Sequence, residues 1–95
     1  MVTIIIVTMY EIVFTQIAKT QYDQLSTRLK NQIDKGIERI SVNPKIGKLL
    51  RGELKGIYSE RVATFRILYT INKMQIELIL LSIEHRKSVY GGHEL

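Results

Sequence analysis

The chain contains no cysteine, which excludes disulfides, zinc–thiolate sites and cysteine nucleophiles and permits a cytoplasmic location. It also lacks the HExxH, GxxxxGK[ST] and GxSxG motifs of zinc proteases, phosphate-loop nucleotide-binding proteins and serine hydrolases. Its carboxylates are scattered along the chain, whereas glycosidases and two-metal nucleases need them in pairs. The sequence therefore predicts neither a metal site nor a cofactor.

Long apolar runs are also missing. Residues 2–8 form a mostly apolar run that includes two threonines, but no basic residue precedes it and no small-residue cleavage site follows. Glu11 interrupts the run long before the ~18 apolar residues that a membrane span needs. We therefore expect no export signal and no membrane partner. Residues 1–8 are interpreted as a strand or an extension, and residues 9–92 as the domain itself.

The sequence contains 95 residues, of which 45% are hydrophobic, as expected for one folded domain. The formal net charge is +5, and most of it lies in the second half of the chain. Residues 1–44 hold five basic and four acidic side chains, whereas residues 45–90 hold nine basic and four acidic ones. This asymmetry favours a polyanionic partner such as nucleic acid, although a solubilising surface has the same composition.

The first half of the chain has the pattern of a short strand and two helices. Residues 10–14 are β-rich, and Thr15 can cap a helix over residues 16–25. Ser26 or Thr27 can cap a second amphipathic helix that continues to about Val42. The helix is expected to stop there, because the following Asn43-Pro44 pair disfavours helical backbone.

The second half reads as three strands after a basic, glycine-containing connector at residues 45–56. The strands are predicted at residues 57–63, 65–71 and 75–83, with Asn72-Lys73 as a tight turn. The last is apolar on both faces, which predicts a central strand covered on both sides. The order β-α-α-β-β-β predicts an α+β fold with two helices on one face of a small antiparallel sheet. A short helix or turn is expected at the C-terminus.

Strand parity separates the apolar side chains from two arginines. Along residues 65–71 the apolar positions alternate with Arg66, which is expected on the face away from the helices. If the preceding hairpin aligns as its length suggests, Arg61 shares that face. Two guanidinium groups on an open sheet can bind a phosphate through bidentate hydrogen bonds. The alternative is that each arginine pairs with Glu60, Glu77 or Glu84 and has no further role.

The segment from His85 to Tyr90 begins where the last strand ends. We expect this strand to deliver His85 and Arg86 to an edge of the face that carries Arg66. An unperturbed histidine titrates at about 6.5, which suits general acid–base catalysis. Tyr90 can stack on a base or position a phosphate, or it can anchor the tail to the core.

From residue 9 to residue 91 the chain resembles the RelE/ParE superfamily, small toxins encoded with an antitoxin in bacteria and archaea. The resemblance rests on MYEIVFT before two helices, the connector GKLLRGELKGIYS, the strand pair RVATFRILYTI and the ending EHRKSVY. It implies a metal-independent endoribonuclease that enters the ribosomal A site and cuts messenger RNA. The 2′-hydroxyl of the substrate would attack the adjacent phosphate.

The resemblance also assigns roles to residues of this chain. Arg61 and Arg66 match strand cations, and His85, Arg86 and Tyr90 match the terminal histidine, arginine and tyrosine of the family. Further positions expected to bind RNA or phosphate are Lys48, Arg51, Lys55, Ser59 and Lys87.

Some members of the family carry two lysines where this chain has Ser59 and Arg61. Serine is uncharged and arginine barely deprotonates, so His85 becomes the main candidate for the base, with Glu60 or Glu84 as weaker ones. Ala63-Thr64 stands where a Gly-Asp turn is common.

Two alternatives to the endonuclease remain: a ParE-like inhibitor of DNA gyrase, and a degraded toxin that acts only in a repressor complex. Under each of them the expected partner is a cognate antitoxin, whose complex with the toxin binds its own operator DNA. The antitoxin is expected to dock on the apolar groove beside the helices and on the basic face.

Overall fold

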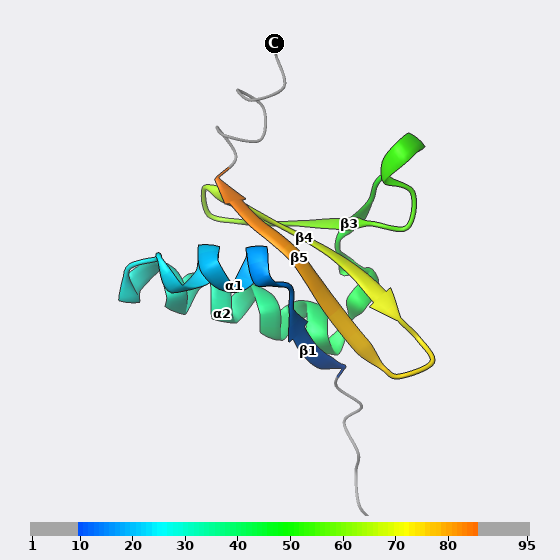
Figure 1. Ribbon diagram of the computed structural model, residues 1–95, viewed down its shortest axis with the longest axis horizontal. Helices are drawn as coiled ribbons and strands as arrows, with labels where there is room; N and C mark the ends of the chain where they lie inside the picture. Colours follow the sequence, from blue (N-terminus) through cyan, green and yellow to red (C-terminus); the bar gives the residue numbers. More distant parts are fainter. Residues whose placement is uncertain (1–9, 86–95) are drawn as a thin grey trace, which may run out of the picture.

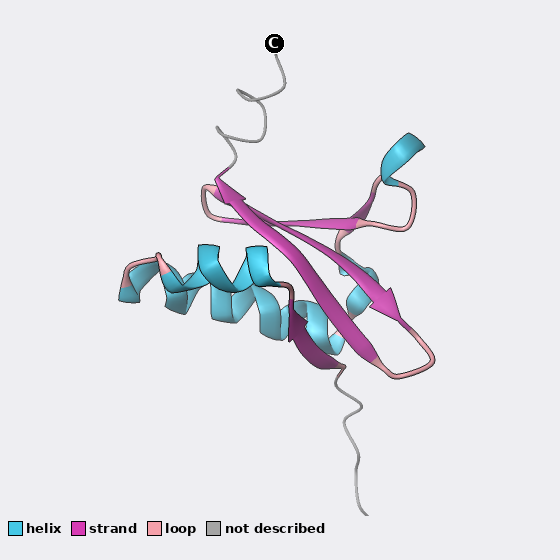
Figure 2. Cartoon of the chain, viewed as in Figure 1, coloured by secondary structure: helices cyan, strands magenta, loops and turns pink. Residues whose placement is uncertain are grey.

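Two capped helices form the first layer of the protein, whose computed structural model describes residues 10–85 (Figures 1 and 2). Helix α1 spans Gln16–Asp23, and the Thr15 hydroxyl accepts a hydrogen bond from the Ala18 N–H at 3.1 Å. Helix α2 spans Thr27–Val42 and is capped by Ser26 in the same way. Both predicted caps are confirmed, and α2 ends before Pro44 as expected.

The second layer is a five-stranded sheet in the order β1-β5-β4-β3-β2 (Figure 1). The strands are β1 (Glu11–Phe14), β2 (Lys48–Leu49), β3 (Tyr58–Val62), β4 (Phe65–Asn72) and β5 (Glu77–His85). The predicted α+β fold with both helices on one face is confirmed. Strand β1 pairs with β5 in parallel, whereas the other pairs are antiparallel. The parallel pairing of β1 and β5 is possible because no hairpin joins these two strands, which are the first and the last in the sequence.

The connector between α2 and β3 is more ordered than the sequence suggested. It contains the 3₁₀ turns η1 (Pro44–Ile46) and η2 (Gly52–Leu54), with the edge strand β2 between them. Two residues are too few to give a period-2 pattern, which is why the sequence did not reveal this strand.

The two hairpins use different turns. Strands β3 and β4 are joined by Ala63 and Thr64 alone, and Ala63 has a φ of 54°. The predicted turn at Asn72-Lys73 is wrong, because Asn72 still pairs with Glu77 and residues 73–76 form a four-residue turn. The last strand is therefore displaced from the predicted residues 75–83 to Glu77–His85.

The core lies between the helices and the sheet. Its most buried side chains are Ala18, Ile33, Ile40, Val62, Ile67, Tyr69, Leu78, Leu80 and Ile83. Helix α2 approaches β3 closely at Gly36, where an added Cβ would collide with the Val62 side chain. Ile67 and Tyr69 are buried as strand parity predicted, so Arg66 is directed to the opposite face.

A β-bulge in β5 decides which side chains of the last strand face the helices. Leu68 pairs with Ser82 and Tyr69 pairs with Leu80, so Leu81 is the extra residue. Strand β5 has the predicted inner position in the sheet. Both helices lie on one face of β5 (Figure 2). On its other face Ile79 is half-buried and Ser82 is buried, so the predicted cover on both sides stays a prediction.

Neither α1 nor α2 is long and apolar enough to cross a membrane. The predicted extension at residues 1–8 and the predicted C-terminal helix or turn lie outside the described residues.

Candidate functional site

Strands β3 and β4 place two arginines directly opposite each other on the sheet face that the helices do not cover. Arg61 and Arg66 are cross-strand partners, separated only by the two-residue turn and one further residue pair. Side chains of directly opposed residues lie on the same face with their Cβ atoms about 4.5–5.5 Å apart. The prediction that these arginines share a face is confirmed.

Two neighbouring rows of cross-strand partners define the site. One row runs across β2, β3, β4 and β5 through Lys48, Ser59, Leu68 and Ser82. The next row contains Arg61, Arg66 and Glu84. Three cations from three different strands are thereby brought together, although Lys48 and Arg66 are 18 positions apart in the sequence.

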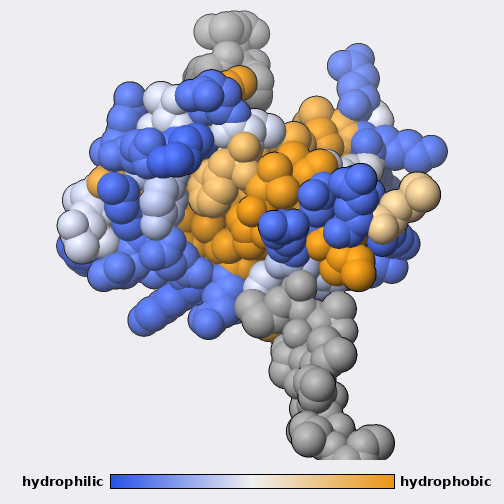
Figure 3. Space-filling model, turned by 60° about the horizontal axis from the view of Figure 1, so that its bottom comes forward, coloured by the Kyte–Doolittle hydropathy of each residue, from blue (hydrophilic) through white to orange (hydrophobic). Residues whose placement is uncertain are grey.

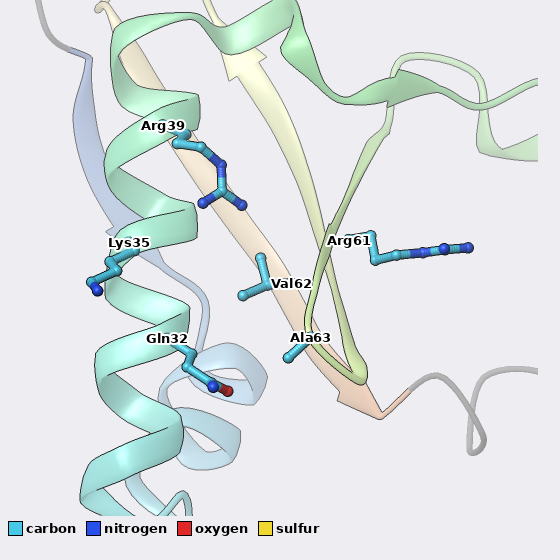
Figure 4. A pocket seen from close by; sticks show the side chains of 6 residues that line it. All are labelled: Gln32, Lys35, Arg39, Arg61, Val62 and Ala63. Atoms are coloured by element: carbon cyan, nitrogen blue, oxygen red, sulfur yellow. The ribbon is translucent and has the colours of Figure 1, made fainter.

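Lys48, Ser59, Arg61 and Arg66 line a cavity of about 300 Å³, which we call the basic cavity. Ser59 forms its buried floor, with 7% of its surface exposed, whereas the side chain of Arg61 is exposed. Figure 4 shows Arg61 pointing away from α2 while its neighbour Val62 points toward it. Directly opposed like charges destabilise a sheet, so an anion bound between the guanidinium groups would relieve their repulsion.

The acidic residues that could neutralise the arginines are distributed over both faces. Glu60 alternates with Arg61 and lies on the helix side, where it accepts a hydrogen bond from Arg39 of α2 at 3.3 Å. It is therefore held away from the basic cavity, which removes it as a candidate base. Glu84 is the cross-strand partner of Arg66 and lies on the cavity face.

His85 does not lie where strand parity was expected to place it. Its cross-strand partner is Phe65, and the two rings meet edge to face with their centroids 5.3 Å apart. The prediction that it reaches the edge of the Arg66 face is wrong, because the bulge at Leu81 shifts the register by one residue and exchanges the faces beyond it. The alternation of Ser82 and Glu84 around buried Ile83 is the sequence signal of this exchange.

The remaining predicted residues lie around the cavity or outside the described chain. Arg51 and Lys48 both line a second, adjoining cavity of about 430 Å³ on the connector. Lys55 is exposed after η2. The predictions for Arg86, Lys87 and Tyr90 fall on residues that the structure does not describe.

A third cavity of about 240 Å³ separates α2 from the β3–β4 hairpin (Figure 4). Its lining includes Gln32, Lys35 and Arg39 from α2 and Ala63 from the turn. Within residues 10–85 there is no group of three or more histidine or carboxylate side chains that could hold a metal ion.

Strand β4 also contacts the connector, through the hydroxyl of Tyr69 on the helix side of the sheet. Its hydroxyl donates to the Pro44 carbonyl oxygen at 2.6 Å and accepts from the Gly47 N–H at 3.2 Å. Burial raises the pKa of Tyr69 to about 12, so the hydroxyl keeps its proton throughout the physiological range. Sequence reasoning placed this tyrosine in the core but missed its contact with the connector, because the two are about 22 residues apart.

Comparisons with known proteins agree with this geometry. The family model for a ParE-like toxin of type II bacterial toxin–antitoxin systems matches residues 12–93. The chain is 32% identical to the toxin RelG of Mycobacterium tuberculosis over 83 residues, which cover 85% of this chain and 95% of RelG.

Solved structures show the same similarity. A chain of the toxin–antitoxin complex RelBE2 from Mycobacterium tuberculosis is 31% identical and superposes with a TM-score of 0.76, covering 83% of this chain and 93% of the other. The isolated toxin RelE of E. coli has the same fold at 20% identity, with a TM-score of 0.71 and coverage of 87% and 93%. The chain therefore belongs to the ParE-like toxin family of type II bacterial toxin–antitoxin systems.

Proposed function

We propose that this toxin is a metal-independent endoribonuclease that cuts messenger RNA in the ribosomal A site. The observation that carries the proposal is the basic cavity, where Lys48, Arg61 and Arg66 converge on the sheet face opposite the helices. The guanidinium forks of the two arginines match the oxygens of a phosphodiester.

The proposed reaction uses the nucleophile of the substrate itself. The ribose 2′-oxygen attacks the adjacent phosphorus while a base takes its proton, and the bond from phosphorus to the 5′-oxygen breaks as an acid protonates that oxygen. The products are a 2′,3′-cyclic phosphate and a 5′-hydroxyl. Arg61, Arg66 and Lys48 stabilise the negative charge of the pentacoordinate phosphorus in this scheme.

Two side chains at the end of β5 compete for the role of base. His85 is exposed and matches the family histidine, but it stands on the side of Phe65. Glu84 lies on the cavity face opposite Arg66. We propose His85 as the proton carrier because of the family resemblance, and Glu84 as the alternative because of its position opposite Arg66. If Glu84→Gln slows cleavage more than His85→Gln does, the carboxylate has this role. Arg86 and Tyr90 are proposed to complete the clamp by resemblance alone.

A cognate antitoxin is the proposed partner, as RelBE2 was solved as a toxin–antitoxin complex. An acidic segment of the antitoxin would neutralise Arg61 and Arg66, and its apolar side chains would cover exposed apolar surface of the toxin. Figure 3 shows such a continuous apolar area between hydrophilic ones. The complex is proposed to bind its own operator DNA. The affinity of the pair should fall as salt rises if the acidic contact is correct.

The test of the nuclease is primer extension on a messenger RNA, with the protein added to programmed ribosomes and, separately, to free RNA. We expect cuts only on the ribosome, and we expect Arg66→Ala to abolish them. Arg28→Ala is the matched control, because Arg28 is an exposed arginine at the start of α2.

Two other results of the primer-extension and growth assays would refute the nuclease. If the folded protein stops growth without cutting RNA in either sample, the proposal is refuted in favour of a gyrase inhibitor. If there are neither cuts nor growth arrest, the toxin is degraded and acts only in a repressor complex.

A further inference from the structure

The strand that carries Lys48 into the basic cavity is too short to hold itself in place. Strand β2 consists of Lys48 and Leu49, both exposed, and it lies at the edge of the sheet. Strands in globular proteins usually have three to ten residues, so a two-residue edge strand depends on contacts at its ends. The position of the Lys48 side chain therefore depends on what fixes the connector before and after it.

Tyr69 fixes the part of the connector that precedes Lys48, between the end of α2 and β2. Its ring is fully buried and stacks on Tyr58, with centroids 5.4 Å apart and an interplanar angle of 18°. From this rigid position its hydroxyl bridges Pro44 and Gly47, the residue directly before Lys48. On the other side, the Leu50 N–H donates to the Ile57 carbonyl oxygen at 2.8 Å.

The connector passes Tyr69 too closely for any side chain at Gly47. A Cβ there would lie 2.5 Å from the Tyr69 hydroxyl oxygen and 3.0 Å from the Ser59 carbonyl oxygen. Gly47 has an ordinary φ of −74°, so this close approach, and not a left-handed backbone, is what requires glycine. The backbone is thereby held between β4 and β3 one residue before Lys48 pairs with Ser59.

We propose that Tyr69 is a positioning residue of the basic cavity, which through its hydroxyl sets the Pro44–Gly47 turn so that Lys48 stands opposite Ser59 beside Arg61 and Arg66. The ring lies in the core on the helix side, and its effect on the cavity passes through the backbone of the connector. This inference rests on the proposed function for its consequence in RNA binding, but its structural part can be measured without RNA.

The perturbation is Tyr69→Phe, which keeps the ring, its stacking and its volume and removes only the two hydrogen bonds. Tyr58→Phe is the matched control, because it removes a hydroxyl from the same stack that makes neither contact with the connector. Each is combined with Lys48→Met, which keeps the length of the lysine stem and removes its charge. The probe is a short 2′-deoxy oligonucleotide, which lacks the attacking hydroxyl and is bound without being cut.

We expect Tyr69→Phe to weaken oligonucleotide binding about two- to fivefold, the effect of one exposed ionic contact. The slope of log affinity against log salt should fall by about 0.7, the value for one lost phosphate contact on a single strand. In the Lys48→Met background the same change should have no further effect, because the charge that it displaces is already absent. If the Tyr69 hydroxyl only stabilised the fold, Tyr69→Phe would lower the melting temperature equally with and without Lys48→Met. The slope of log affinity against log salt would then be unchanged.

The structural part is read by NMR from cross-strand contacts between Lys48 and Ser59. They should weaken in Tyr69→Phe and persist in Tyr58→Phe. The inference is overturned if the Lys48–Ser59 contacts persist in Tyr69→Phe. It is also overturned if the affinity losses of Tyr69→Phe and Lys48→Met add up in the double variant.

If the wild-type protein does not bind the oligonucleotide but the contacts are lost, the proposed function fails while the positioning of Lys48 by Tyr69 stands. If Tyr69→Phe does not fold, Gly47→Ala displaces the connector from the other side. It should then give the same loss of contacts and the same dependence on Lys48, and unchanged contacts would overturn the inference.

Discussion

Replacing Arg61 by glutamine should stabilise the folded protein while weakening its binding to RNA. Arg61 is exposed and directly opposite Arg66, so the folded state holds two like charges close together, and Glu84, the partner of Arg66 on β5, offsets part of their repulsion. Two unit charges about 6–8 Å apart in water repel each other by at most about 0.5–0.7 kcal/mol at low salt. Arg61→Gln keeps a long polar side chain and removes this repulsion. For a chain of this size the melting temperature should rise by about 2–5 °C.

The assay is urea denaturation of the wild type and of Arg61→Gln at low and at high salt. The gain in free energy of unfolding should be present at low salt and vanish near 1 M salt, where the screening length falls to about 3 Å. Inorganic phosphate should stabilise the wild type more than the variant, because an anion that binds only the folded state shifts unfolding by mass action.

Arg28→Gln is the control, since this arginine is exposed on α2 and not opposed across the sheet. No stabilisation of Arg61→Gln at low salt, or the same stabilisation at all salt concentrations, would refute the idea that the two guanidinium groups repel each other.

Three further predictions concern the scaffold. Ala63→Gly should stabilise the protein by about 0.5–1 kcal/mol in urea denaturation, because Ala63 has a φ of 54° that glycine adopts without strain. Gly36→Ala should destabilise it by about 1–3 kcal/mol despite the better helix propensity of alanine, since the added Cβ collides with Val62; a circular-dichroism melt measures the loss. The hydrogen bond from Tyr22 to Asp34 raises the pKa of Tyr22 to about 12 from 10.0. The stability difference between the wild type and Tyr22→Phe should therefore be complete below pH 10 and disappear as the pH rises through 12.

Much of the fold could be predicted because its signals are local. Thr15 and Ser26 cap the two helices, and Asn43-Pro44 ends the second, each through hydrogen bonds or sterics within a few residues. Alternation along residues 65–71 placed Arg66 opposite the core for the same reason.

The errors arose where pairing across strands decides the outcome. The bulge at Leu81 exchanged the faces of Glu84 and His85, so the carboxylate faces the cavity and the imidazole packs on Phe65. The alternation of Ser82 and Glu84 around Ile83 indicates the faces beyond the bulge, but the place of the bulge is set by the pairing of β5 with β4, which no pattern within β5 fixes.

The sequence by itself determined the class of fold, the family resemblance and the charge that favours an anionic partner, since these depend on composition, periodicity and short motifs. Only the tertiary structure decided which cations meet. Lys48 joins Arg61 and Arg66 because β2 pairs with β3, and Tyr69 holds the connector from the opposite side of the sheet. Contacts between residues so far apart depend on chain packing, and no local propensity encodes them.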